Sequence, residues 1–213
     1  MKNILAFGDS LTWGADAKSG GRHPFEYRWP NALQAQLDGQ VRVFAEGLNG
    51  RTTVFDDYAI GTERNGSKIL PTLLGTHEPL DLVIILLGTN DMRTHICGNA
   101  AGSAVGITRL IRIIKTFDYK PEHKVPEILV LSPPPVEQGE DKLFNQVMDG
   151  AVSLSREYAA AYKIVCEREN VAFFDAATVA DIDPVDGVHL DKENTQALGK
   201  ALAPEVKRIL SLD

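Results

Sequence analysis

Five short apolar runs alternate along the chain with longer segments of helical periodicity. The runs are four to six residues long, are rich in Val, Ile, Leu and Phe, and span residues 4–7, 41–44, 82–87, 128–131 and 171–174. Their hydrophobicity is continuous rather than alternating, which is typical of strands that are covered on both faces of a parallel sheet. The pattern therefore predicts five central strands.

Helical periodicity fills the segments between these runs. It is present in residues 30–37, 104–117 and 193–210, and residues 143–169 form a long stretch rich in Ala, Glu and Lys. Strands that alternate with helices imply right-handed crossovers around a parallel sheet. We expect a single domain over residues 1–213, with an α/β fold of three α/β/α layers. A flavodoxin-like strand order, 2-1-3-4-5, is the expected arrangement of its five-stranded parallel sheet.

Composition excludes several classes of protein. The chain has 213 residues, is 44% hydrophobic, carries a formal net charge of −7 and has no cluster of Lys and Arg, so we expect no nucleic-acid partner. Only two cysteines occur, Cys97 and Cys166, which argues against a disulfide scaffold. Because no apolar run approaches the roughly 18 residues that span a bilayer, and no secretion signal is recognisable, we expect a cytoplasmic protein that does not bind membranes.

Polar clusters follow the predicted strands. In parallel α/β sheets ligands bind at the carboxyl ends of the strands, so these clusters are expected to meet at one edge. They comprise residues 8–14, 46–53, 88–91 and 186–189. Their convergence indicates a catalytic site more strongly than any one of them.

Ser10 is the candidate nucleophile. It lies just past the first strand in Gly8-Asp9-Ser10-Leu11, where its hydroxyl can be exposed at the sheet edge. A serine needs a neighbouring base to remove its proton during attack. The alternative interpretation is that Asp9 or Ser10 only caps the following helix.

His189 is the candidate base. Of the five histidines, it has Asp186 three residues before it, in a turn where the carboxylate can orient the imidazole. The rival pair is Asp91 and His95, which we interpret instead as a helical surface pair four residues apart. His95 and Cys97 alone are weak evidence for a metal, and we predict none.

Three groups are candidate donors to the oxyanion of an acyl-transfer reaction. Gly50 can offer its backbone N–H because glycine permits close approach of the main chain. The Asn90 side chain and the backbone N–H of Ser10 complete the set. Taken alone, Asn90 is also a common turn residue.

These clusters resemble the four sequence blocks of the SGNH, or GDSL-type, hydrolase family. The first block resembles Gly8-Asp9-Ser10-Leu11, the second contains Gly50, the third resembles Gly88-Thr89-Asn90-Asp91, and the last is Asp186-x-x-His189. The resemblance implies a Ser10–His189–Asp186 triad, an oxyanion hole of Ser10, Gly50 and Asn90, and esterase chemistry without a cofactor.

Finer details resemble the bacterial arylesterases and acyltransferase-like perhydrolases. Trp13, the run Arg51-Thr52-Thr53 and the run Asn90-Asp91-Met92-Arg93 carry this likeness. It implies hydrolysis of small acyl or aryl esters, acyl transfer to alcohols or peroxide, and a homo-oligomer. A carbohydrate acetylesterase, a thioesterase and a lysophospholipase with the same triad remain alternatives. Arg51 replaces the Asp of many family members, which makes the lysophospholipase less suitable.

Aromatic residues near the first loop are candidates for an apolar acyl or aryl pocket. They are Trp13, Phe25, Trp29 and Phe55, with Tyr27 and Tyr58 nearby. Packing in the core or in an interface is the alternative for at least half of them. The non-helical run of residues 21–25 could extend toward a neighbouring subunit. Residues 51–79 and 133–142 are long connections of the kind that shape substrate sites.

A non-enzymatic nucleotide- or flavin-binding module is the competing hypothesis. Gly61-x4-Gly66-Ser67-Lys68 superficially resembles a phosphate loop. The match fails because a phosphate loop needs Lys before Ser and a strand before the first glycine.

Overall fold

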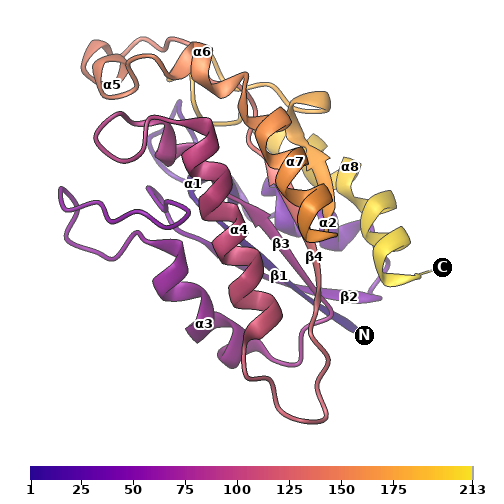
Figure 1. The fold of residues 1–213 in the computed structure, drawn as a ribbon. Helices are drawn as coiled ribbons and strands as arrows, with labels where there is room; N and C mark the ends of the chain where they lie inside the picture. Colours follow the sequence, from indigo (N-terminus) through magenta and orange to yellow (C-terminus); the bar gives the residue numbers. More distant parts are fainter. Residues whose placement is uncertain (213) are drawn as a thin grey trace.

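The computed structural model describes residues 1–212, and it contains the five predicted strands in one parallel sheet (Figure 1). The strand order is β2-β1-β3-β4-β5, which confirms the predicted 2-1-3-4-5 order. The strands are β1 (Lys2–Gly8), β2 (Val41–Gly47), β3 (Leu82–Leu86), β4 (Glu127–Ser132) and β5 (Ala172–Asp175).

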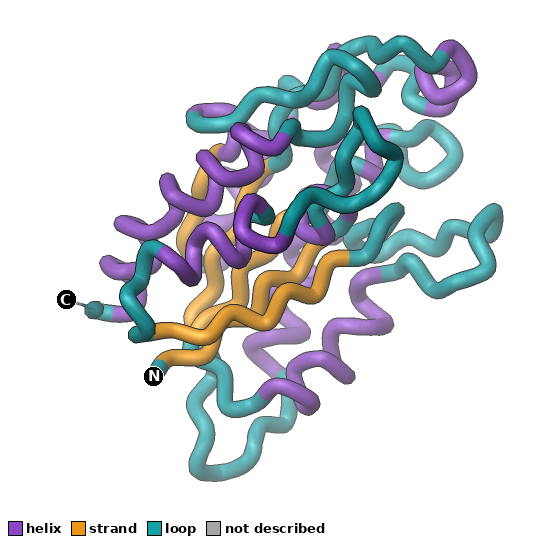
Figure 2. The backbone as a smooth tube through the Cα atoms, turned by 180° about the vertical axis from the view of Figure 1, so that it is seen from behind, coloured by secondary structure: helices purple, strands orange, loops and turns teal. Residues whose placement is uncertain are grey.

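Helices cover both faces of the sheet, so the predicted three-layer architecture is confirmed (Figures 1 and 2). They are α1 (Ser10–Trp13), α2 (Trp29–Ala35), α3 (Gly66–His77), α4 (Ala100–Thr116), α5 (Lys142–Val147), α6 (Ala151–Ser155), α7 (Tyr158–Glu169) and α8 (Lys192–Leu210). Short 3₁₀ turns are η1 (Phe25–Tyr27), η2 (Asn90–Met92) and η3 (Ala176–Thr178).

Two hydrophobic cores lie on opposite faces of the sheet. Successive strand residues point to opposite faces, so Leu5 and Phe7 pack in the core beneath α3, α4 and α7, whereas Ile4 and Ala6 pack beneath α2 and α8. All four side chains have no exposed surface. This two-sided burial is the physical reason for the continuous hydrophobicity of the strand sequences.

Two stretches contain helices whose bounds the sequence pattern does not give. Residues 143–169 hold three helices, α5, α6 and α7, and Gly150, with a left-handed φ of 76°, separates α5 from α6. Residues 51–79 are not only a connection, since they contain α3. The periodicity of α3 is masked by Pro71 within it and by its glycines, which ordinarily interrupt helices.

Among residues 1–212, no helix combines the length and the hydropathy that crossing a membrane requires.

Candidate active site

Ser10 lies at the carboxyl edge of the sheet, at the first position of α1. The strand β1 ends at Gly8, and Asp9 caps the new helix by accepting a hydrogen bond from the Leu11 N–H at 2.9 Å. The cap and the candidate nucleophile are therefore adjacent residues with separate contacts. Ser10 keeps its side chain free to face the neighbouring histidine, although only 5% of the residue is exposed.

His189 connects Ser10 to Asp186. Its Nε2 lies 2.9 Å from Ser10 Oγ, and its Nδ1 lies 2.5 Å from Asp186 Oδ2. The second carboxylate oxygen of Asp186 accepts the backbone N–H groups of Val188 and His189, each at 2.9 Å. These contacts orient the imidazole so that one nitrogen faces a hydroxyl and the other an anion.

The Asp186–His189 turn depends on a close approach of two chain segments. Gly187 has a φ of 72°, and its backbone carbonyl accepts the Glu137 N–H at 2.8 Å. A Cβ on Gly187 would lie 2.2 Å from the Glu137 carbonyl oxygen, and one on Gly139 would lie 2.3 Å from the backbone of Asp186. The segment after β4 thus supports the turn directly.

Asp186 is held in its ionised form. Burial alone would raise the pKa of this carboxyl, but the hydrogen bonds from the His189 side chain and from the backbone of His189 and Val188 outweigh burial and lower it. A carboxylate here favours a proton on Nδ1 and leaves Nε2 as the acceptor that faces Ser10.

Gly50 and Asn90 come to the same place from the loops after β2 and β3. Gly50 has a φ of 80°, a left-handed conformation that suits glycine. Asn90 Nδ2 lies 3.0 Å from the Arg51 carbonyl oxygen and 3.5 Å from Asp9 Oδ2. The amide is therefore fixed to the loop that carries Gly50.

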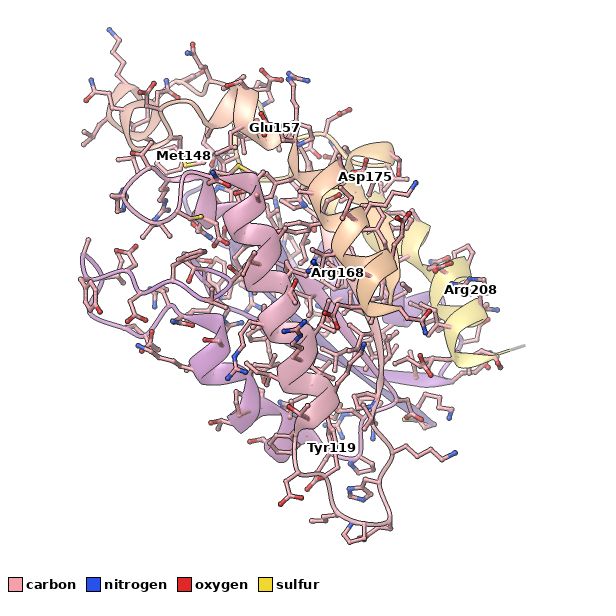
Figure 3. All side chains as sticks on the ribbon, viewed as in Figure 1. Tyr119, Met148, Glu157, Arg168, Asp175 and Arg208 are labelled. Carbon is pink, nitrogen blue, oxygen red and sulfur yellow. The ribbon has the colours of Figure 1, made fainter. Side chains whose placement is uncertain are left out.

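All five predicted site residues line one cavity of about 260 Å³. Its other polar walls come from Asp16, Asn49, Thr89 and Arg93. Its apolar side chains come from Ala15, Ala17, Phe144, Met148 and Val188. Met148 marks the cavity end of the molecule in Figure 3, and Tyr119 marks the opposite end.

Asp9 and Arg51 are buried near this cavity. From the sequence, Asp9 was considered only as a helix cap, and Arg51 only as a difference from many family members. Burial raises the pKa of Asp9 to about 7, although the Leu11 N–H opposes the shift. Burial likewise lowers the pKa of Arg51 to about 10. Arg51 Nη1 donates to the Gly8 carbonyl at 2.8 Å and to the Glu46 carbonyl, so it ties the ends of β1 and β2 together.

Asp91 and His95 do not form the predicted surface pair. Asp91 is completely buried and belongs to η2, whereas His95 is exposed. Asp91 accepts hydrogen bonds from Thr53 and Ser103 instead. A helical spacing of four residues misled the sequence interpretation, because the chain after Met92 leaves helical geometry.

The aromatic residues proposed for the pocket do not line this cavity. Trp29 has no exposed surface, packs in the core, and donates its indole N–H to Thr12 Oγ1 at 3.2 Å. The Arg22 guanidinium lies over the Trp13 ring, 4.8 Å from its centroid. Phe25 is 64% exposed, and Phe55 is half-buried on the loop before α3. The residues that sequence reasoning missed are Phe144 and Met148, from the stretch of residues 143–169 that is rich in Ala, Glu and Lys.

Two segments make contacts within the chain that do not suit the roles considered for them from the sequence. These are residues 61–68, compared with a phosphate loop, and residues 21–25, considered as an extension toward a neighbouring subunit. Lys68 pairs with Asp56 at 2.7 Å and with Glu63 at 3.1 Å, on the first turn of α3, so it is engaged by carboxylates. Within residues 21–25, the His23 N–H donates to the Gly14 carbonyl at 2.8 Å, so this run folds back on its own chain.

Comparison with known proteins supplies the family. Residues 6–196 match the model of the GDSL-like lipase/acylhydrolase family. The chain belongs to this family. No curated protein matches the sequence.

Three solved structures superimpose on at least 98% of this chain. A carbohydrate acetylesterase family member from Sinorhizobium meliloti is 46% identical, with a TM-score of 0.97 and 100% of both chains covered. The aryl esterase of M. smegmatis is 38% identical, with a TM-score of 0.94 over 99% of this chain and 100% of that one. A second carbohydrate acetylesterase from S. meliloti is 36% identical, with a TM-score of 0.92 over 98% of this chain and 100% of the other.

This GDSL protein is therefore an esterase, a hydrolase that acts on esters. The family resemblance that the four sequence blocks indicated is confirmed.

Proposed function

We propose that this GDSL esterase hydrolyses short-chain acyl and aryl esters through an acyl-enzyme on Ser10. The proposal is carried by one observation, the pair of contacts that joins Ser10 Oγ to His189 Nε2 at 2.9 Å and His189 Nδ1 to Asp186 Oδ2 at 2.5 Å. The three residues line a cavity that Gly50 and Asn90 also line. A nucleophile, a base and an orienting carboxylate are the parts that acyl transfer requires.

The reaction proceeds in two halves. His189 takes the Ser10 proton as Oγ attacks the ester carbonyl, and the N–H groups of Ser10 and Gly50 and the Asn90 amide hold the oxyanion. His189 then gives the proton to the leaving alcohol, and the acyl group stays on Ser10. Water resolves the acyl-enzyme, with His189 again acting as base, and an alcohol or peroxide in place of water would yield acyl transfer.

The size of the cavity supports small acyl groups. The cavity volume of about 260 Å³ lies just below the range of about 300–1,000 Å³ that is typical of small-molecule sites. The side chains of Phe144 and Met148 give it an apolar wall on one side.

Deacetylation of carbohydrates is the second candidate function. Polar walls from Asp16, Asn49 and Arg93 offer partners for hydroxyl groups, which an aryl leaving group lacks. The Sinorhizobium meliloti relatives described as carbohydrate acetylesterases favour the same direction. An acetyl group suits both candidates, so the leaving group is what separates them.

Ser10→Ala tests the nucleophile. We expect wild-type protein to be labelled stoichiometrically by a fluorophosphonate and to hydrolyse p-nitrophenyl acetate, and Ser10→Ala to lose both properties. Ser153→Ala is the matched control, because Ser153 is an exposed serine on α6 whose hydroxyl contacts the Gly150 carbonyl. Activity that survives in Ser10→Ala contradicts the proposal.

A substrate series tests the specificity. We expect the ratio kcat/KM to fall from acetyl to butyryl to octanoyl p-nitrophenyl esters. Rates on acetylated sugars that exceed those on aryl acetates would select the second candidate, and a preference for acyl-CoA would select a thioesterase.

A homo-oligomer is proposed from the resemblance to the arylesterase branch. The 64% exposure of Phe25 leaves an apolar ring available to a neighbouring subunit. Light scattering after size exclusion measures the assembly directly, and a mass of one chain, 23.3 kDa, would contradict the proposal.

A further inference from the structure

A buried hydrogen-bond network lies behind the oxyanion hole. Asp91 Oδ2 contacts Thr53 Oγ1 at 2.5 Å and Ser103 Oγ at 2.6 Å, while Asp91 Oδ1 accepts the Thr53 N–H at 3.0 Å. Ser103 Oγ lies 2.7 Å from the hydroxyl of Tyr162, which also lies 3.1 Å from the Leu87 carbonyl oxygen. The four side chains of this network, from Thr53, Asp91, Ser103 and Tyr162, belong to residues with no exposed surface.

The network joins the two loops that carry the hole. Thr53 lies three residues after Gly50, and Asp91 directly follows Asn90, so the Asp91–Thr53 contacts cross from one loop to the other. The contact of Asn90 Nδ2 with the Arg51 carbonyl crosses the same gap at 3.0 Å. Ser103 on α4 and Tyr162 on α7 then anchor Asp91 to the helical layer.

Gly88 shows how closely the network is fitted to the loop. It has a φ of 129°, and a Cβ there would lie 2.3 Å from the Tyr162 hydroxyl. The tyrosine therefore reaches the end of β3 through space that only a glycine leaves open.

The directions of these hydrogen bonds indicate what the carboxyl group does. Thr53 and Ser103 donate their hydroxyl hydrogens to Asp91 Oδ2, and Tyr162 donates its hydroxyl to the Leu87 carbonyl oxygen. Asp91 therefore serves as the common acceptor for the loop that carries Gly50 and for α4.

We propose that Asp91, anchored by Ser103 and Tyr162, is a positioning residue of the oxyanion hole, which fixes the Asn90 loop to the Gly50 loop. This inference rests on the proposed function, because Gly50 and Asn90 are its oxyanion donors. Displacement of a donor from the oxyanion raises the free energy of the transition state more than that of the bound ester, so it lowers kcat.

Four titratable groups interact electrostatically with the Asp91 carboxyl group. They are Asp9 from the β1–α1 junction, Cys97 from the loop before α4, and Tyr158 and Tyr162 from α7. Burial raises the pKa of Asp91 to about 6, against the hydrogen bonds from Ser103 and Thr53 that lower it.

Two tyrosines on α7 provide the test. Tyr162→Phe removes a hydroxyl with two contacts, and Tyr158→Phe removes a buried hydroxyl that has no hydrogen-bond partner among the described residues. The rings pack against each other with centroids 5.5 Å apart, so both variants keep the same aromatic pair. We expect Tyr162→Phe to lower kcat on p-nitrophenyl acetate about tenfold with KM within about twofold, and Tyr158→Phe to change neither.

Asp91 variants separate hydrogen bonding from charge. Asp91→Asn keeps an acceptor for the Thr53 N–H and supplies permanent donors, so we expect it to retain kcat within about threefold of wild type. Asp91→Ala removes every contact and should lose at least about tenfold in kcat. Ser103→Ala, which breaks the link between Asp91 and Tyr162, serves if Tyr162→Phe does not fold.

The outcomes are distinct. Equal kcat values for folded Tyr162→Phe and Tyr158→Phe, or an Asp91→Asn variant no better than Asp91→Ala, overturn the positioning role while wild-type activity stands. A wild-type chain that is not labelled by fluorophosphonate overturns the proposed function, and this inference with it.

Discussion

At the scale of single residues, the site places each charge where the proposed reaction needs it. Asp186 is ionised because the hydrogen bonds from His189 and Val188 outweigh its burial, and it orients the imidazole toward Ser10. Asp9 is buried beneath the same nucleophile, and its pKa is raised to about 7 instead. Two carboxyl groups near one serine thus differ in ionisation because one faces an imidazole and the other is enclosed.

Asp186→Asn should lower kcat about 10³- to 10⁴-fold, because it leaves the turn intact but spoils the orientation of the base. The amide oxygen can still accept the Val188 and His189 N–H groups, while the amide nitrogen now faces His189 Nδ1 as a donor. Steady-state kinetics on p-nitrophenyl acetate measure the loss. A variant within tenfold of wild type would contradict the assigned role.

Asn90→Ala should lower kcat about 10²- to 10³-fold, since it removes one donor to the oxyanion. Fluorophosphonate labelling should also slow, because the trapped phosphonyl oxygen uses the same hole. Asn31→Ala is a suitable control, because the Asn31 amide donates to the Phe25 carbonyl on an exposed surface. An unchanged labelling rate for Asn90→Ala would count against the hole.

At the scale of elements, the catalytic turn is supported by a segment that has no regular structure. The N–H of Glu137 donates to the Gly187 carbonyl at 2.8 Å, and that of Glu140 donates to the Val185 carbonyl at 2.9 Å. These contacts, and the absence of side chains at Gly139 and Gly187, let the two segments touch. The connection after β4 therefore shapes the site by supporting its histidine.

Gly187→Ala should displace this turn and reduce activity far more than its backbone strain alone would predict. Gly150→Ala is the matched control, because Gly150 also has a positive φ, 76°, but a Cβ there meets nothing within 4 Å. Both variants should lose about 1 kcal/mol of unfolding free energy to the left-handed conformation. Only Gly187→Ala should also lose kcat, and equal kinetics for the two would refute the close-contact argument.

At the scale of the whole molecule, the parallel sheet gathers groups from distant parts of the sequence at one edge. Ser10 and His189 are separated by 179 positions yet share a 2.9 Å contact. Asp9 and Asp91 are buried near this edge of the sheet. Among residues 1–212, neither carboxyl group accepts a hydrogen bond from a cationic side chain. Stability consequently depends on pH.

Unfolding free energy should fall as pH rises from about 4 to about 7. The pKa of Asp9 rises from 3.8 to about 7 on folding and that of Asp91 from 3.8 to about 6, so the folded state binds more protons than the unfolded state in this window. Asp9→Asn should be more stable than wild type at pH 8 and should match it near pH 4.5. Urea unfolding at both pH values measures this, and a wild-type midpoint that rises between them would contradict the buried-acid explanation.

Much of the fold and site could be predicted from residue patterns. The five apolar runs are strands because burial on both faces demands continuous hydrophobicity, and the polar residues after them identified Ser10, Gly50, Asn90, Asp186 and His189. The helix α3 was missed because Pro71 hides its period, and the boundary between α5 and α6 was not predicted because no local pattern marks the left-handed conformation of Gly150.

The amino-acid sequence by itself determined the five strands and the candidate residues of the triad and the oxyanion hole, because these follow from hydrophobic period and from short polar clusters at strand ends. Only the tertiary structure decided which side chains wall the cavity, that Trp29 belongs to the core, and that Asp91 faces Thr53, Ser103 and Tyr162 rather than His95. These contacts join residues from separate loops and helices. Their partners are set by how the layers pack, which no local pattern encodes.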